Sequence, residues 1–310
     1  MNSPSNAMPE SSLDTQGIAP AAMPATRPMY WSVRRELWEN RSIYVAPLAV
    51  AAVFLFGFLV STITVPHRMR DVLALDPVQQ HELIEQPYIF AAGLLMVTQM
   101  LVGVFYSLDA LHGERRDRSI LFWKSLPVSD LTTVLSKASI PLVVLPLLTV
   151  AITVVTQLIM LLLSTTVLLG SGLSVATLWR QLSLFQMSLM LFYHLLTVHA
   201  LWHAPIYGWL LLVSGWARGA AFLWAALPLV AIGVVEKIAF NTSHFAAVLG
   251  YRMTGPEAFV FTTPGSISMD PLTHLSPGKF LSSPGLWIGL AVAAAFLAAA
   301  VRLRRYRGPI

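Results

Sequence analysis

The chain has 310 residues, of which 56% are hydrophobic and 11% charged, with no cysteine and a formal net charge of +5. Soluble domains carry about 25% charged residues, so this composition excludes an ordinary soluble domain and is typical of an integral membrane protein. A chain without cysteine has no disulfide framework, thiolate metal site or cysteine nucleophile. The basic residues cluster beside apolar runs, so their excess reports membrane topology rather than a nucleic-acid partner.

Residues 1–29 are rich in Pro, Ser, Ala and Met and show no hydrophobic periodicity. They also lack the apolar core of a secretory signal, so we expect a disordered cytoplasmic tail. Met29 is an alternative to Met1 as the native translation start.

From Tyr30 to Arg41 the pattern becomes helical. Tyr30, Val33, Leu37 and Trp38 fall on one helical face, and charged residues occupy the remainder. This pattern predicts an amphipathic helix lying in the plane of the lipid headgroups.

Six apolar runs follow, against the ~20 residues that a helix needs to cross the hydrocarbon. The predicted spans are 43–65, 89–111, 138–163, 182–213, 220–235 and 285–301. The fourth run is too long for one straight crossing, so we expect a kinked span that breaks near Pro205 and continues as an interfacial piece. On the sixth, Ala291, Ala295 and Ala299 share a face suited to close helix packing. The predicted fold is an all-α, six-span membrane domain over 30–307.

Six spans place both termini on one side of the membrane. Segments on the terminus side carry fourteen Lys or Arg, whereas segments on the opposite side carry six. By the positive-inside rule, we expect a bacterial-type inner (plasma) membrane protein with both termini cytoplasmic. The long polar segment 236–283 is then extracytoplasmic.

Between the second and third spans lies a charged stretch with five consecutive charged residues, 114–118. Such a run is excluded from hydrocarbon, where each unpaired charge costs roughly 2.5–3.5 kcal/mol. Glu114 and Arg118 form an i,i+4 pair in the favourable order, and the apolar residues 120–123 supply contact area. The stretch therefore predicts a small exposed docking helix over 114–124, with an ordinary cytoplasmic loop as the alternative.

Two residues mark where this docking helix stops and the next helix starts. Pro127 ends the first, and Ser129 is positioned to cap the second. Asp109, one turn before the end of the second span, is expected to reach the interface or to pair with nearby arginines rather than to act as a buried carboxylate.

The chain contains no phosphate-binding G-x-x-x-x-G-K-[ST] loop and no H-E-x-x-H, G-x-S-x-G or G-x-G-x-x-G motif. We therefore predict no catalytic residue, no metal site and no cofactor on this chain. On the fourth span His199 and His203 are at i,i+4, but His194 is half a turn out of line for an α-helix. Packing histidines, or histidines lining a polar cavity, are favoured over metal ligands because the span has no carboxylate.

Polar residues within the spans are candidates to line a substrate pathway. They are Gln99, Gln157, Gln186, His199 and His203. Periodicity alone does not show whether these side chains share one cavity.

These features together make the chain resemble a permease subunit of the ABC-2-type transporter family. The resemblance rests on the amphipathic 30–41 helix and on the Glu114-Arg…Leu-Pro-Val-Ser129 stretch between spans two and three. It rests also on the Trp202-His-Ala-Pro-Ile-Tyr-Gly-Trp209 segment and on the long outer segment before span six. It covers the chain from about residue 30 onward, and the family offers no role for the preceding tail.

The resemblance implies that the cytoplasmic stretch is a coupling helix docking into a cleft on a separate ATP-binding subunit. The residues implied in docking are Glu114, Arg115, Arg116, Asp117, Arg118, Phe122, Trp123 and Pro127. It implies a complex of two permease chains, identical or different, and two ATPase chains, with ATP and Mg on the partner subunit. The segment after span five would form short helices dipping into the outer leaflet, and the complex would export an amphiphilic or toxic compound.

The sequence is also compatible with two other functions. The chain fits a membrane anchor or sensor accessory that recruits a cytosolic partner without transport. An intramembrane, histidine-dependent metalloenzyme is disfavoured by the missing carboxylates. Nothing in the spans selects a substrate.

Overall fold

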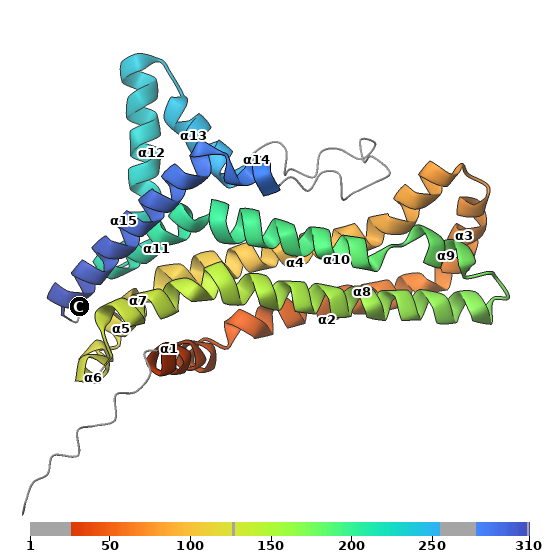
Figure 1. Cartoon of the computed structure of the whole chain (residues 1–310), viewed down its shortest axis with the longest axis horizontal. Coiled ribbons are helices and arrows are strands. Elements are labelled where there is room, and N and C mark those ends of the chain that lie inside the picture. Colours follow the sequence, from red (N-terminus) through yellow and green to blue (C-terminus); the bar gives the residue numbers. More distant parts are fainter. Residues whose placement is uncertain (1–25, 126–127, 255–276, 309) are drawn as a thin grey trace, which may run out of the picture.

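The computed structural model describes residues 26–125, 128–254, 277–308 and 310, and all regular elements in these ranges are helices (Figure 1). Six helical runs are long and apolar enough to cross a membrane, which confirms the prediction of an all-α integral membrane protein. They cover Ser42–Leu73, Pro77–Arg116, Asp130–Gly170, Ala176–Trp202, Ala221–Phe240 and Pro284–Tyr306.

The first half of the chain forms an antiparallel set of long helices. Its elements are α1 (Thr26–Glu39), α2 (Ser42–Ser61), η1 (Thr62–Thr64), α3 (Val65–Leu73), α4 (Pro77–Asp109), α5 (His112–Arg116), α6 (Ile120–Ser125), α7 (Asp130–Ser139), η2 (Ile140–Val144) and α8 (Leu145–Gly170). Several helices extend beyond the predicted spans. α4 begins twelve residues early because Asp76 caps it, accepting hydrogen bonds from the backbone N–H groups of Val78 and Gln79.

The second half adds one broken crossing, a hairpin and the final span. Its elements are α9 (Ala176–Gln181), α10 (Leu184–His194), η3 (Leu195–Trp202), α11 (Ala204–Trp216), α12 (Ala221–Phe240), α13 (His244–Thr254), α14 (Pro277–Leu281) and α15 (Pro284–Tyr306). The α12–α13 hairpin stands away from the long bundle, and α1 lies at the same bundle end as the C-terminus (Figure 1).

Two of the crossings contain π-helical stretches, η2 and η3, in which hydrogen bonds run from i to i+5. Both lie next to prolines: Pro141 is inside η2, and Pro205 follows η3. A proline has no N–H to donate and its ring crowds the carbonyl four residues back, so the helix before it is displaced from α geometry. The two π-helical stretches contact each other.

The predicted break near Pro205 is therefore present, at His203 between η3 and α11. The interfacial position expected for the piece after it stays a prediction. α11 packs along α15 and α4 and buries most of its residues, and Gly208 allows a close approach to α15.

The contact between α11 and α15 is the most extensive in the bundle. Gly208 faces the backbone of α15 so closely that an added Cβ would lie 3.3 Å from the carbonyl oxygen of Ala293. On α15 the inward side chains are those of Leu286, Gly289, Ala293, Ala300 and Arg304. The predicted packing face was wrong, since Ala291 and Ala295 are exposed.

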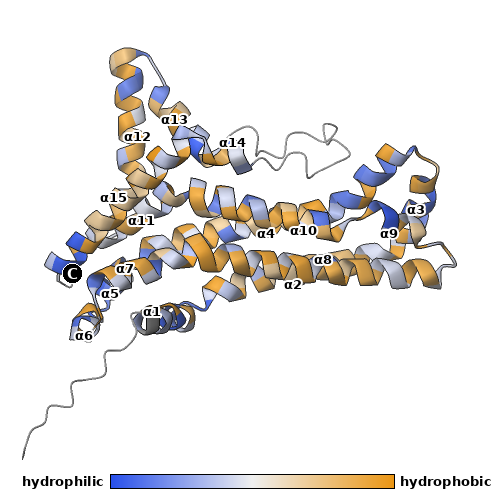
Figure 2. Cartoon of the chain, viewed as in Figure 1, coloured by the Kyte–Doolittle hydropathy of each residue, from blue (hydrophilic) through white to orange (hydrophobic). Residues whose placement is uncertain are grey.

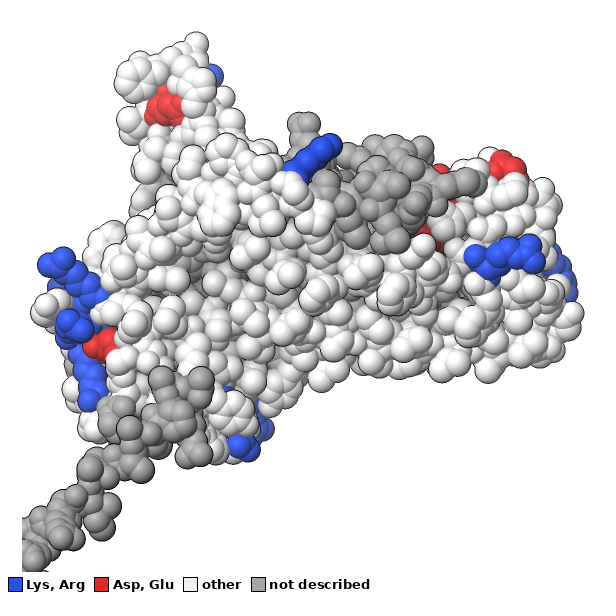
Figure 3. Space-filling view, in the orientation of Figure 1, with Lys and Arg blue, Asp and Glu red and all other residues white. Residues whose placement is uncertain are grey.

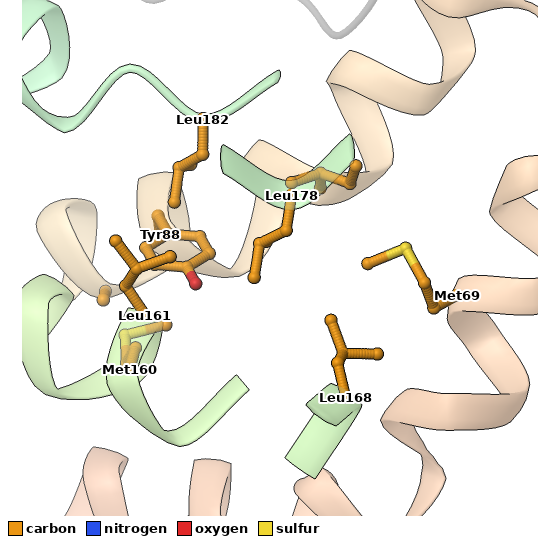
Figure 4. Close-up of a cluster of buried hydrophobic side chains, with 9 residues drawn as sticks. Met69, Tyr88, Met160, Leu161, Leu168, Leu178 and Leu182 are labelled. Carbon is orange, nitrogen blue, oxygen red and sulfur yellow. The ribbon is translucent and has the colours of Figure 1, made fainter. Parts of the chain in front are cut away.

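Hydrophobic residues predominate along the length of the bundle, and hydrophilic residues are more frequent at its two ends (Figure 2). At the end formed by α3 and α9, an apolar cluster joins α3, α4, α8 and α9 (Figure 4). At the opposite end, Lys and Arg surround a few acidic residues (Figure 3).

The close approach of α11 and α15 is testable with two glycines in comparable helices. Gly208→Leu should lower the thermal midpoint of the detergent-solubilised chain, because overpacking a tight interface costs about 1–3 kcal/mol. Gly93→Leu is the matched control, because an added Cβ there meets nothing within 4 Å. Equal midpoints for the two variants in size-exclusion thermostability assays would contradict this packing.

Candidate functional site at the charged end of the bundle

Glu36 lies at the centre of the charged end and has no exposed surface. Its carboxylate accepts hydrogen bonds from Lys137 Nζ at 2.9 Å, Arg35 Nη2 at 2.7 Å and the Tyr106 hydroxyl at 2.8 Å. These partners come from α7, α1 and α4, so one carboxylate joins three elements. The sequence pattern places Glu36 among the charged residues outside the apolar face of α1, whereas in the structure Glu36 is buried where α1 packs on α7.

Glu114 of α5 extends the same cluster. Its carboxylate contacts Lys137 Nζ at 3.1 Å, Arg35 Nη2 at 3.3 Å and Arg304 Nη2 at 3.2 Å, and Arg304 also pairs with Asp130. We refer to Arg35, Glu36, Glu114, Asp130, Lys137 and Arg304 as the charge network. It has three cations and three anions and is therefore electrically balanced.

Balance matters because these groups are largely removed from water. Lys137 is 2% exposed and Arg304 is 5% exposed. An isolated buried charge carries a desolvation penalty of several kcal/mol, which mutual attraction offsets only when geometry is good and hydrogen bonds are made. The sequence signals for this network were Lys137 beside the predicted third span and Glu36, one of two glutamates in the amphipathic helix, and neither specifies a partner.

Arg115 fixes α5 to the end of α11. Its guanidinium donates to the backbone carbonyls of Gly215 at 2.8 Å, Ala217 at 3.1 Å and Gly308 at 3.2 Å. A cation at the carbonyl end of a helix also complements the helix dipole. The α5 segment is thus held by α11 and by the C-terminal residues.

The predicted exposed helix over 114–124 is corrected in two respects. The chain forms two short helices, α5 and α6, separated where Arg118 adopts a left-handed backbone with φ of 60°. Glu114 and Arg115 are buried, because internal partners satisfy both, so they are not presented to a partner protein. Pro127 lies outside the described residues. The Ser129 cap is confirmed, since its hydroxyl accepts from the Thr132 N–H at 3.1 Å.

The exposed part of this stretch is smaller than expected. Arg116 pairs with Asp117 at 3.0 Å and with Asp109 at 3.7 Å, which agrees with the prediction that Asp109 pairs near the interface. The exposed residues are Arg116, Asp117, Arg118, Leu121, Phe122, Lys124 and Ser125.

Trp123 links α6 back to the charge network. The Arg35 guanidinium carbon lies 3.9 Å from the centre of the Trp123 ring, a cation–π contact. Phe122 packs edge-on against Trp123 with ring centres 4.9 Å apart, and 60% of Phe122 remains exposed. Of the two aromatic residues expected to dock a partner, Phe122 is therefore the free one.

The outward face of α1 carries the exposed aromatic residues Tyr30, Trp31 and Trp38. Arg34 lies over Trp31 and Trp38, at 5.2 Å and 4.8 Å from the ring centres. The predicted apolar face is thus divided, because Val33 and Leu37 pack inward against the core. Aromatic rings beside arginine suit the headgroup region of a bilayer.

The rings of the three histidines follow one another along the fourth crossing. The ring centres of His194 and His199 are 5.5 Å apart, and those of His199 and His203 are 5.2 Å apart. The expected half-turn offset of His194 was wrong because π-helical bonding places residues five apart one turn apart. Among the described residues, no group of three or more His, Asp or Glu side chains is arranged to hold a metal ion.

The candidate pathway residues lie at different levels of the bundle. Gln157 donates to the Tyr88 carbonyl at 3.2 Å, toward the α3–α9 end, and Gln99 is fully buried nearer the middle. Gln186 is half-buried on α10. His203 contacts the Met253 carbonyl of α13 at 3.1 Å.

Comparison of the chain with protein-family models, with curated proteins and with solved structures finds no match.

Breaking the charge network at Lys137 should strongly destabilise the chain. Lys137→Met leaves Glu36 and Glu114 short of a cation, and loss of one partner from a buried pair costs about 3–5 kcal/mol. Thermal unfolding in detergent measures this, with Arg116→Met as the exposed control expected to match the parent. A Glu36→Gln/Lys137→Met double variant should recover part of the loss, and no recovery would argue against pairing.

The stability of the folded chain should also depend on pH through Glu36. Burial by itself would raise the pKa of Glu36, but Lys137 and Arg35 lower it below its ordinary value of 4.5. A lowered carboxyl pKa stabilises the fold above about pH 4.5, and that contribution is lost as the pH falls through the lowered pKa. Unfolding midpoints should therefore drop on acidification, and less steeply in Glu36→Gln. Parallel pH profiles for parent and variant would contradict this assignment.

Proposed function

We propose that this chain is a transmembrane permease subunit of an ABC transporter, driven by separate ATP-binding subunits. The observation that carries the proposal is the α5–α6 unit at the bundle end. α6 presents Leu121 and Phe122 to the outside, while α5 beneath it is fixed in the charge network. An exposed apolar contact on a rigid base is what a docking element requires.

The network gives this element connections to the spans. Glu114 reaches Lys137 on the helical run that continues into α8, and Arg304 on α15. Trp123 reaches α1 through Arg35. A displacement of α6 by a partner would thus be passed to three elements as a rigid-body movement. ATP binding that brings two docked subunits together would move these helices as a unit.

The partners follow from the same reasoning. The chain has no phosphate-binding loop, so ATP and Mg belong to the partner, and this chain is not itself an enzyme. The complex contains two permease and two ATPase chains. Both termini and α5–α6 face the cytoplasm of a bacterial-type inner membrane, supported by the gathering of basic residues at that end (Figure 3).

The cargo proposed is an amphiphilic or toxic compound that is exported. A groove of about 1130 Å³ lies between α2–α3 and α4. Its walls are mainly apolar, including Phe54, Phe58 and Phe90, and Arg68 and Asp71 also line it. This combination suits a molecule with an apolar body and a polar end.

A membrane anchor that recruits a cytosolic partner without transport is the second candidate. It is favoured by the burial of Gln99 and Gln157, which are 0% and 2% exposed in the single chain. Reconstitution with the partner separates the two: export of an amphiphile coupled to ATP hydrolysis supports the permease, and binding without transport supports the anchor.

Docking is tested best at Phe122. Phe122→Ala should reduce co-purification of an ATP-binding subunit in mild detergent several-fold without lowering the amount of this chain, because Phe122 makes few internal contacts. Trp123→Ala is less informative, since it also removes the contact with Arg35.

Phe185→Ala is the matched control, because Phe185 is 78% exposed on α10, far from α6. It should leave co-purification unchanged. An ATPase that is retained equally by both variants, or absent from the parent preparation, would remove the proposed docking role.

A further inference from the structure

A set of fully buried polar groups lies within the apolar bundle and is not used by the charge network. Gln99 of α4 and Thr149 and Thr153 of α8 are each 0% exposed. Neither amide atom of Gln99, nor the hydroxyl of either threonine, has a hydrogen-bond partner among the described residues. Buried polar groups are normally hydrogen-bonded, so such a set requires an explanation.

The neighbouring Thr156 shows what α8 ordinarily does with a hydroxyl. Its Oγ1 donates to the Ile152 carbonyl at 2.7 Å, within the same helix. Thr149 and Thr153 do not make this internal bond. Their hydroxyl groups are therefore left for a partner outside their own helix.

The way α4 and α8 are aligned places Gln99 and the two threonines at the same height in the bundle. The two helices run antiparallel, with Gln157 bonded to the carbonyl of Tyr88 and Leu95 packed with Ile152. One turn further along α4 from Leu95 is Gln99, and one turn back along α8 from Ile152 is Thr149. The unpartnered groups thus meet at the same height in the bundle.

The π-helical stretch η3 closes this level from a third side. Met96 of α4, Val150 of α8 and Leu195 of η3 share one packed cluster. About one turn beyond Leu195 is His199, which is 7% exposed and whose Nδ1 has no partner among the described residues. We call Gln99, Thr149, Thr153 and His199 the polar seam.

The chemistry of the seam restricts what it binds. It offers one amide, two hydroxyls and one imidazole, which together both donate and accept hydrogen bonds. It includes no carboxylate or ammonium group that would balance an ion, and its members are too well buried to admit a large molecule without rearrangement. A small neutral molecule with two donors and two acceptors meets these requirements.

We propose that the polar seam is an internal hydration site, where ordered water bridges α4, α8 and η3. Water there supplies the hydrogen bonds that the three helices do not supply to each other. His199 of the site contacts His203, and His203 in turn contacts the Met253 carbonyl of α13. Water in the site would therefore hydrate the His199 end of this series of contacts. The inference is independent of the proposed transport function.

X-ray hydroxyl-radical footprinting tests this directly, because radicals form from bound water and oxidise the side chains beside it. The full chain in detergent is irradiated, and oxidation rates of Met96, His199 and Met160 are compared by mass spectrometry. Met160 belongs to the apolar cluster of Figure 4 and is 0% exposed, so it is the buried reference outside the polar seam. Met96 and His199 should be oxidised several-fold faster than Met160.

Replacing polar residues of the seam with apolar ones should remove the bound water. Gln99→Leu/Thr149→Val/Thr153→Val should lower the oxidation rates of Met96 and His199 toward that of Met160. Thr156→Val, which removes an internally bonded hydroxyl, should leave them unchanged. If the triple variant does not fold, Thr153→Val should show a smaller decrease.

The proposal is overturned if Met96 and His199 in the parent chain are oxidised as slowly as Met160. It is equally overturned if folded seam variants keep the parent rates.

Discussion

The pairing of Glu36 with Lys137 is the contact on which the charged end of this protein depends. Both side chains are almost completely removed from water, so neither is tolerated there without the other. Because Glu36 comes from α1 and Lys137 from α7, the requirement for charge balance fixes the first helix on the bundle. Glu114, Arg35 and Arg304 then bring α5 and α15 to the same point.

Different kinds of interaction stabilise the two ends of the bundle. At the α3–α9 end, apolar side chains interdigitate, and stabilisation comes from packing (Figure 4). At the charged end, directional ion pairs impose a specific arrangement. A docking element benefits from the second kind of support, since rearranging one member leaves the others without partners. This contrast is why we place the proposed partner contact on α6 rather than at the opposite end.

Between the ends, prolines and π-helical stretches set which residues meet. η3 changes the residue spacing on the fourth crossing, so that three histidines align and His199 reaches the level of Gln99. Gly208 allows α15 to approach α11 closely. The bundle thus combines rigid apolar contacts with one local polar interior.

The sequence by itself determined that the chain is an all-helical membrane protein with six spans, because the length and hydropathy of each run are local properties. It also predicted the Ser129 cap, the pairing of Asp109 and the break at Pro205, each of which involves residues within a few positions along the chain.

Only the tertiary structure decided which charges are buried. Glu114 and Arg118 have the spacing of a helical pair, yet Glu114 turns inward to partners 23 and 190 residues away in the chain. Likewise, the alignment of the histidines depends on a π-helix that periodicity does not reveal. Long-range charge pairing and helix distortion depend on residues that are distant in sequence but close in the folded structure. Local sequence patterns do not identify those residues.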